Sequence, residues 1–151
     1  MTIEIIQNNY DSQVIDHGLL ETAIRLTLDK HAKPDVEITL TLTNNEAVRQ
    51  LNMTYLGLDK TTDVLAFNQD FDNPETGRFY LGDVIISIDQ AKLQAHENNH
   101  TLDEECAFLT IHGTLHLLGY DHSDQKEKDV MWAIQEDIMN ELRLSREEKS
   151  E

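Results

Sequence analysis

The sequence predicts a single α+β domain, in which a mixed four-stranded sheet is covered by about five helices. A chain of 151 residues suits one domain that can bury its own core. Segments with alternating polarity are interspersed with segments of helical periodicity, in the order strand, helix, strand, helix, two strands and three helices. Since no repeat or linker interrupts this order, we assign residues 1–144 to the domain and 145–151 to a charged, frayed tail.

Four segments are expected to be strands: 2–7, 36–43, 61–67 and 80–87. They are rich in β-branched and aromatic residues, and the second, VEITLTLT, alternates polar and apolar side chains as a half-buried strand does. Between the last two, the polar stretch 68–78 contains Pro74 and Gly77. We expect this stretch to be an exposed turn or loop.

Five segments are expected to be helices: 11–31, 44–56, 88–98, 103–118 and about 124–143. Apolar residues recur at helical spacing in the first, and Pro34 follows it, where a helix usually stops. Asparagines of the capping type open the second, and Ser123 or Asp124 can cap the last. The residues expected to be buried in the last two helices are Cys106, Leu109, Ile111, Leu115, Val130, Ile134, Ile138 and Leu142.

The chain is strongly acidic, with 29 acidic residues against 12 basic ones and a net charge of -17. Such a surface repels polyanions, so RNA binding would need a local basic cleft, the charge of a metal ion or a partner. The simplest interpretation of the acidity is solubility. Without an apolar stretch of spanning length or a secretory leader, and with only one cysteine, we expect a cytoplasmic protein.

Residues 112–122, HGTLHLLGYDH, contain three of the seven histidines. His112 and His116 lie on one face of a helix, because four residues turn about 400° and rise about 6 Å. On a continued helix His122 would lie about 120° off that face and about 9 Å further along. Gly119 can adopt the left-handed conformation that ends a helix, so the chain can turn and bring His122 back.

Three neutral imidazoles make a good zinc site with a fourth position open for water or substrate. A structural zinc site usually has four ligands, often cysteines, but Cys106 is six residues before His112 and points elsewhere. Two histidines four apart are often only a helix surface, but the third after a glycine favours a metal. We therefore predict one Zn²⁺ per chain, with His112, His116 and His122 as its ligands and as the catalytic group acting through it.

The frame H-x-x-x-H-x-x-G-x-x-H is similar to the long zinc motif of metzincin proteases, which implies a zincin-like metal helix. Those proteases have a glutamate directly after the first histidine, which acts as a general base. Here this position is Gly113, so peptide hydrolysis by that route lacks its base. A zinc hydrolase acting on a peptide or a small molecule is thus the weaker alternative.

The segment HGTLHLLGYDH resembles the signature of the YbeY family of bacterial rRNA maturation factors. Two upstream segments, LNMTYLGLDKTTDVLAF and LGDVIISID, resemble the other family blocks in the expected order, so the resemblance covers nearly the whole chain. It implies a four-stranded α+β fold, a cytoplasmic location and the three histidines as metal ligands. It also implies a zinc-dependent, single-strand-specific endoribonuclease in 16S rRNA 3′-end maturation and ribosome quality control.

One position departs from the family pattern. The family has an arginine after the tyrosine of its middle block, implicated in RNA cleavage, and this chain has Leu56 there. A guanidinium can clamp a phosphate through two hydrogen bonds and leucine cannot, which puts nuclease efficiency in doubt. Arg49 and Lys60 are candidate substrate-binding residues that would supply the missing charge.

Asp121 is a candidate to orient an imidazole by accepting its free N–H. The alternative is a turn residue bonded to its own backbone. Asp63 and Asp83 each begin an apolar strand and are expected to mark strand ends at the surface. The family resemblance also makes Asp83 a candidate for the wall of the site. Trp132 fits the last helix without a functional role.

The partners expected for the nuclease are single-stranded rRNA, the small ribosomal subunit with its proteins, and an assembly GTPase. We expect no membrane partner and favour a monomer. The nucleophile is either a zinc-bound hydroxide or the RNA 2′-OH. A rival hypothesis is a metal-stabilised ribosome-assembly factor with little cleavage of its own, because an acidic surface suits basic ribosomal proteins and Leu56 weakens catalysis.

Overall fold

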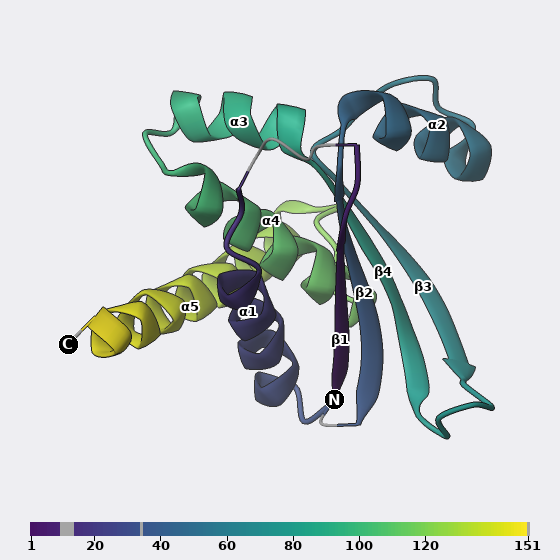
Figure 1. The fold of residues 1–151 in the computed structure, drawn as a ribbon, viewed down its shortest axis with the longest axis horizontal. Helices are drawn as coiled ribbons and strands as arrows, with labels where there is room; N and C mark the ends of the chain where they lie inside the picture. The colour runs from purple at the N-terminus through teal and green to yellow at the C-terminus, as the bar shows by residue number, and fades with distance from the viewer. Residues whose placement is uncertain (10–13, 34, 151) are drawn as a thin grey trace.

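The computed structural model describes residues 1–9, 14–33 and 35–150, with side chains up to Arg146. It confirms the α+β class, with a mixed four-stranded sheet (Figure 1). In spatial order the strands are β1 (Thr2–Gln7), β2 (Val36–Thr43), β4 (Phe79–Ser87) and β3 (Val64–Asp72). The first three run parallel, and β3 lies at the edge, antiparallel to β4.

Five helices accompany the sheet: α1 (His17–Lys30), α2 (Asn45–Leu56), α3 (Ile88–Glu97), α4 (Leu102–Leu117) and α5 (Gln125–Ser150). Helix α4 packs against β3 and β4, and α1 and α5 pack against α4 (Figure 1). Helix α2 covers part of the other face, where its Val48 meets the paired Leu65 and Ile85. In the described part of the chain, no helix combines the length and the apolar character needed to cross a membrane.

The main element positions agree with the prediction, but several boundaries differ. Helix α1 begins at His17 because the Asp16 carboxylate accepts the Leu19 N–H at 3.0 Å and caps the helix. Val14, expected within that helix, precedes it and is 88% exposed. Residues 11–13 of the predicted helix, and Pro34 as its stop, lie outside the described residues.

The expected loop at 68–78 was too long. Strand β3 continues to Asp72 and pairs with β4 down to Phe79, with a register irregularity between Asn68 and Phe71. The side chains of residues 68–72 are exposed, so their polarity does not conflict with the backbone pairing. The connection is therefore confined to residues 73–78.

Helix α5 also differs from its prediction. It continues to Ser150 instead of ending near residue 143, so the backbone of residues 145–150 is helical rather than frayed. Ile138 and Leu142 are buried as expected, but Val130 is 47% exposed. The buried face is rotated to Met131, Gln135, Ile138, Met139 and Leu142, and it therefore includes one polar residue.

The four residues of α4 expected to be buried, Cys106, Leu109, Ile111 and Leu115, are all buried. The helix lies very close to the sheet at Gly113. A Cβ atom at this position would lie 2.5 Å from Val84 Cγ1 and 3.3 Å from Val64 Cγ2. Glycine is thus required for the contact between α4 and the strands beneath it.

Candidate metal centre

The centre is built where α4 ends. The Gly119 N–H donates to the His116 carbonyl at 3.0 Å, and the Tyr120 N–H donates to the Leu115 carbonyl at 3.1 Å. Gly119 has a φ of 104°, so it takes the predicted positive φ and this pair of bonds closes the helix. The chain then reverses and carries His122 back toward α4.

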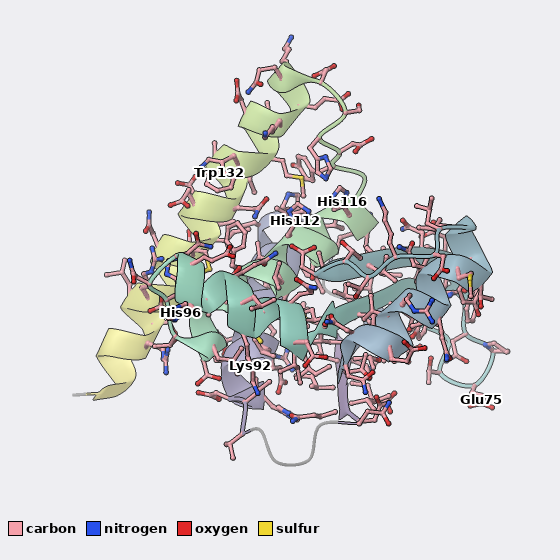
Figure 2. All side chains as sticks on the ribbon, turned by 90° about the horizontal axis from the view of Figure 1, so that it is seen from above. Glu75, Lys92, His96, His112, His116 and Trp132 are labelled. Atoms are coloured by element: carbon pink, nitrogen blue, oxygen red, sulfur yellow. The ribbon has the colours of Figure 1, made fainter. Side chains whose placement is uncertain are left out.

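The turn brings the three predicted histidines together. His112, His116 and His122 each offer one ligand nitrogen, and these atoms lie within 4.8 Å of one another. The Nε2 atoms of His112 and His116 are 3.0 Å apart, and Figure 2 shows both rings at the end of α4. His122 is exposed, whereas the other two rings are partly buried, so the cluster opens to solvent on one side.

The donor set fits a divalent ion of the zinc class. Two imidazole nitrogens bound to one tetrahedral zinc lie about 3.3 Å apart, close to the observed spacing. His112 Nδ1 is 3.1 Å from Gln135 Oε1, and an amide oxygen only accepts, so Nδ1 carries the ring proton. This leaves the lone pair on Nε2 directed at the other two histidines.

Burial lowers the pKa of both His112 and His116 below the ordinary histidine value. For His116, a positive charge on either neighbouring ring would lower the pKa further. Both rings are therefore held neutral at pH 7, which is the state in which imidazole binds a metal.

Gln135 was not found by the sequence analysis. It is 2% exposed, and its Nε2 is buried with no hydrogen-bond partner among the described residues. The only sequence signal is its position on the buried face of α5, one turn after Met131 and one before Met139. A search for apolar periodicity does not select a glutamine.

Of the two roles considered for Asp121, the structure shows the hydrogen bond to the backbone of the turn. Its carboxylate accepts the backbone N–H of His122 at 2.7 Å, which shapes the turn that presents this histidine. The hydrogen bond that orients an imidazole is instead made by Gln135 to His112.

Two cavities adjoin the histidines. The first, of about 290 Å³, is lined by Asp63, Phe108, Leu109, His112, His122, Lys128, Met131, Trp132 and Gln135. The second, of about 470 Å³, is lined by Leu56, residues 64–68 of β3, His116, Gly119, Tyr120 and Asp121. The cluster thus lies between two hollows, one against α5 and one against the edge strand.

The structure does not bring Arg49 or Lys60 to these cavities. Arg49 forms ion pairs with Glu46 and Asp59, so its charge is already neutralised by two carboxylates. Lys60 is exposed and lines neither hollow. Leu56, by contrast, lies on the wall that also contains His116, so the departure from the family pattern is located at the site.

Three other residues lie in places that differ from those expected. Asp83 bonds to Tyr80 and Gln69 and lines neither cavity, whereas Asp63, expected only at the surface, lines the first. Trp132, expected to have no role, is 54% exposed on the wall of the same cavity.

The position after His112 cannot hold a catalytic glutamate. Even a Cβ atom at Gly113 would collide with Val84, because this side of α4 faces the sheet. The general base of the metzincin route is therefore excluded on steric as well as chemical grounds.

Comparison with known proteins agrees with this geometry. A family model described as Endoribonuclease YbeY matches residues 4–143. The curated Endoribonuclease YbeY of Roseiflexus castenholzii is 45% identical over 141 residues, covering 89% of this chain and 88% of the relative. That of Acholeplasma laidlawii is 39% identical over 138 residues, covering 91% and 98%.

A solved structure resembles the whole fold. The solution structure of a Thermotoga maritima protein matches with a TM-score of 0.64 and 25% identity, covering 98% of this chain and 93% of that one. Since the family model spans most of the sequence and the curated relatives align over most of their length, the chain belongs to the YbeY endoribonuclease family.

Proposed function

We propose that this protein is a zinc-dependent, single-strand-specific endoribonuclease that acts in 16S rRNA 3′-end maturation and ribosome quality control. The observation that carries the proposal is the set of three imidazole nitrogens within 4.8 Å, open to solvent between two cavities. Membership of the YbeY family supplies the class of bond cleaved.

His112, His116 and His122 would hold the ion. Zinc bound there would supply a Lewis acid for a phosphoryl oxygen and for a hydroxyl nucleophile. Gln135 fixes the His112 ring through Nδ1, and the Asp121 turn presents His122. The two cavities leave room for the RNA chain on both sides of the phosphate.

The charge distribution limits how RNA is held. With a net charge of -17, the surface repels RNA, so the attraction must be local. Among the described residues that line the first cavity, Lys128 is the positive side chain, and a bound ion would add its own charge. We therefore propose that single-stranded rRNA is presented by the small ribosomal subunit, its basic proteins or an assembly GTPase, to a monomer in the cytoplasm.

The test is cleavage of single-stranded rRNA fragments by the zinc-loaded protein, with a duplex of the same sequence beside it. We expect cleavage of the single strand only, loss of cleavage in His116→Ala, and normal cleavage in His96→Ala. His96 is a matched control because it is an exposed histidine on α3, away from the cluster (Figure 2). Equal activity of His116→Ala and wild type would contradict the proposal. A 2′,3′-cyclic phosphate product would identify the 2′-OH as the nucleophile.

The rival function is a metal-stabilised ribosome-assembly factor. Two observations favour it: the acidic surface suits basic ribosomal proteins, and Leu56 places an apolar side chain on the wall shared with His116. Co-sedimentation with small subunits, with no cleavage of any rRNA fragment, would support this function instead.

A further inference from the structure

The smaller cavity, which we call the Trp132 cavity, has one aromatic and apolar wall and one polar wall. The apolar wall consists of Phe108, Leu109, Met131 and Trp132. The polar groups are Asp63, Lys128 and Gln135, and His112 and His122 close the end at the metal centre. Figure 2 shows Trp132 on α5 beside His112 of α4. A ligand in this cavity would therefore contact whatever is held at the histidines.

Trp132 offers an aromatic surface to this cavity. Its ring packs at an interplanar angle of 65° against Phe108, with the ring centroids 5.7 Å apart, and 54% of the residue stays exposed. The contact with Phe108 braces the ring, while more than half of its surface is left for another group. An aromatic side chain exposed beside a nucleic-acid site is the usual platform for an unpaired base.

Gln135 provides the second, independent observation. Its Oε1 bonds His112, but its Nε2 is a buried donor without a partner among the described residues. A buried donor left unpaired is unfavourable, so a ligand that brings an acceptor to Nε2 gains a hydrogen bond that the described residues do not make. Asp63 on the same cavity is a further acceptor, although its carboxylate oxygens already accept from the Val64 N–H and from Gln94 Nε2.

These groups distinguish between classes of ligand. A purely apolar ligand would leave Gln135 Nε2 unpaired. An isolated phosphate would make no use of the aromatic wall and would face the Asp63 carboxylate. A nucleobase has a flat face for Trp132 and carries both donors and acceptors on its Watson–Crick edge. All four bases carry both donors and acceptors on this edge. The groups in the cavity therefore favour a nucleobase but do not discriminate among the four bases.

We propose that the Trp132 cavity binds one unpaired nucleobase, stacked on Trp132, next to the phosphate at the three histidines. The proposal rests on the proposed nuclease function and adds a reason for its strand specificity. A base within a duplex cannot expose a face to Trp132 and its pairing edge to Gln135 together, so only single-stranded RNA fits.

The chain's single tryptophan makes a direct test available, because all tryptophan emission comes from this cavity. The zinc-loaded protein is titrated with a 2′-deoxy oligonucleotide, whose integrity is checked on a gel after the titration, and with an abasic strand of the same length. We expect the base-containing strand to quench the emission and the abasic strand to bind about 5- to 150-fold more weakly, without quenching. Equal quenching by the two strands would overturn the proposal.

Variants give a second readout, the affinity for a labelled oligonucleotide measured by anisotropy. Trp132→Ala should weaken binding by about 5- to 150-fold, and Trp132→Phe should recover most of it. Leu144→Ala is the matched control, because Leu144 is 60% exposed on the same helix but does not line the cavity. Wild-type affinity in Trp132→Ala would overturn the assignment.

The two proposals fail in different ways. If RNA cleavage depends on His116 but neither the affinity nor the KM responds to Trp132→Ala, the nuclease stands and the base site is overturned. If base-dependent quenching occurs but no RNA is cleaved, the base site stands and the nuclease proposal is overturned.

Discussion

The two ring nitrogens of His112 have different neighbours. Nδ1 is committed to Gln135 Oε1, so Nε2 is the atom that faces His116 and His122. The geometry of the centre therefore depends on a residue from α5 that itself contributes no metal-ligand atom. A hydrogen-bond partner of this kind raises the affinity for the metal, because it fixes the tautomer and the orientation of the imidazole before the ion binds.

Replacing Gln135 by methionine should weaken zinc binding by about 10- to 100-fold, because methionine keeps the length of the side chain but loses the accepting amide oxygen. Gln135→Glu keeps an acceptor and should bind zinc at least as tightly as Gln135→Met. Competition with a chromogenic chelator measures both affinities. Wild-type affinity in Gln135→Met would show that the hydrogen bond does not position the ring.

Leu56 marks a place where charge can be added. It is 55% exposed and lines the cavity that contains His116. Leu56→Arg should tighten RNA binding and steepen the fall of log affinity with log salt by about 0.7 to 1, the slope for one additional phosphate contact. Met53→Arg adds the same charge on α2 outside the cavity and should change the slope less. Equal slopes for the two variants would contradict a specific contact at Leu56.

At the level of elements, α4 is held between the sheet and α5. Gly113 allows the helix to lie on β3 and β4. Gly119 ends the helix at a point from which the following turn brings His122 back beside His112 and His116. Tyr120 secures the turn, since its hydroxyl lies 3.0 Å from His31 Nε2 and its ring packs against that imidazole. The positions of the three histidines therefore depend on the packing of α4 on two sides.

Gly113→Ala should lower the free energy of unfolding by about 1–3 kcal/mol, because the added methyl group meets Val84 in a packed interface. Gly18→Ala is the control, since in α1 the same methyl would approach only the Asp16 side chain. Urea unfolding of the two variants measures the difference. Equal stability would mean that α4 can shift without cost.

Local signals predicted the strands, the helices and the three histidines, because all three ligands lie in one helix end and the turn after it. The polar end of β3 could not be found, since its residues pair through the backbone while their side chains face solvent. Gln135 and Trp132 depend on how α5 rotates against α4, which is a tertiary relation. Proximity in sequence suggested Arg49 and Lys60, but Arg49 forms ion pairs with Glu46 and Asp59, and neither residue lines the two cavities.

For the molecule as a whole, buried titratable groups set the dependence of stability on pH. Glu105 is 4% exposed, and burial raises the pKa of its carboxyl group above the ordinary value, with a smaller contribution from Asp63 and an opposing one from His100. The folded state therefore holds this proton more tightly than the unfolded state. Its contribution to stability is complete below the unfolded pKa and is lost as the pH rises through the folded pKa.

Glu105→Gln should therefore stabilise the protein near pH 7 and have little effect near pH 4. Glu97→Gln, at an exposed position on α3, should change stability by less than about 0.5 kcal/mol at both pH values. Denaturant titrations of the three proteins at the two pH values provide the measurement. A stabilisation by Glu105→Gln that is the same at both pH values would contradict the assignment.

The spacing of the three ligands has a thermodynamic consequence. His112 and His122 are ten positions apart, so an ion bridging them closes only a short segment and ties no distant parts of the chain together. Chelation should consequently loosen the bend after α4 while the sheet and its helices persist. This protein would then differ from zinc fingers, whose polypeptide needs the ion in order to fold at all.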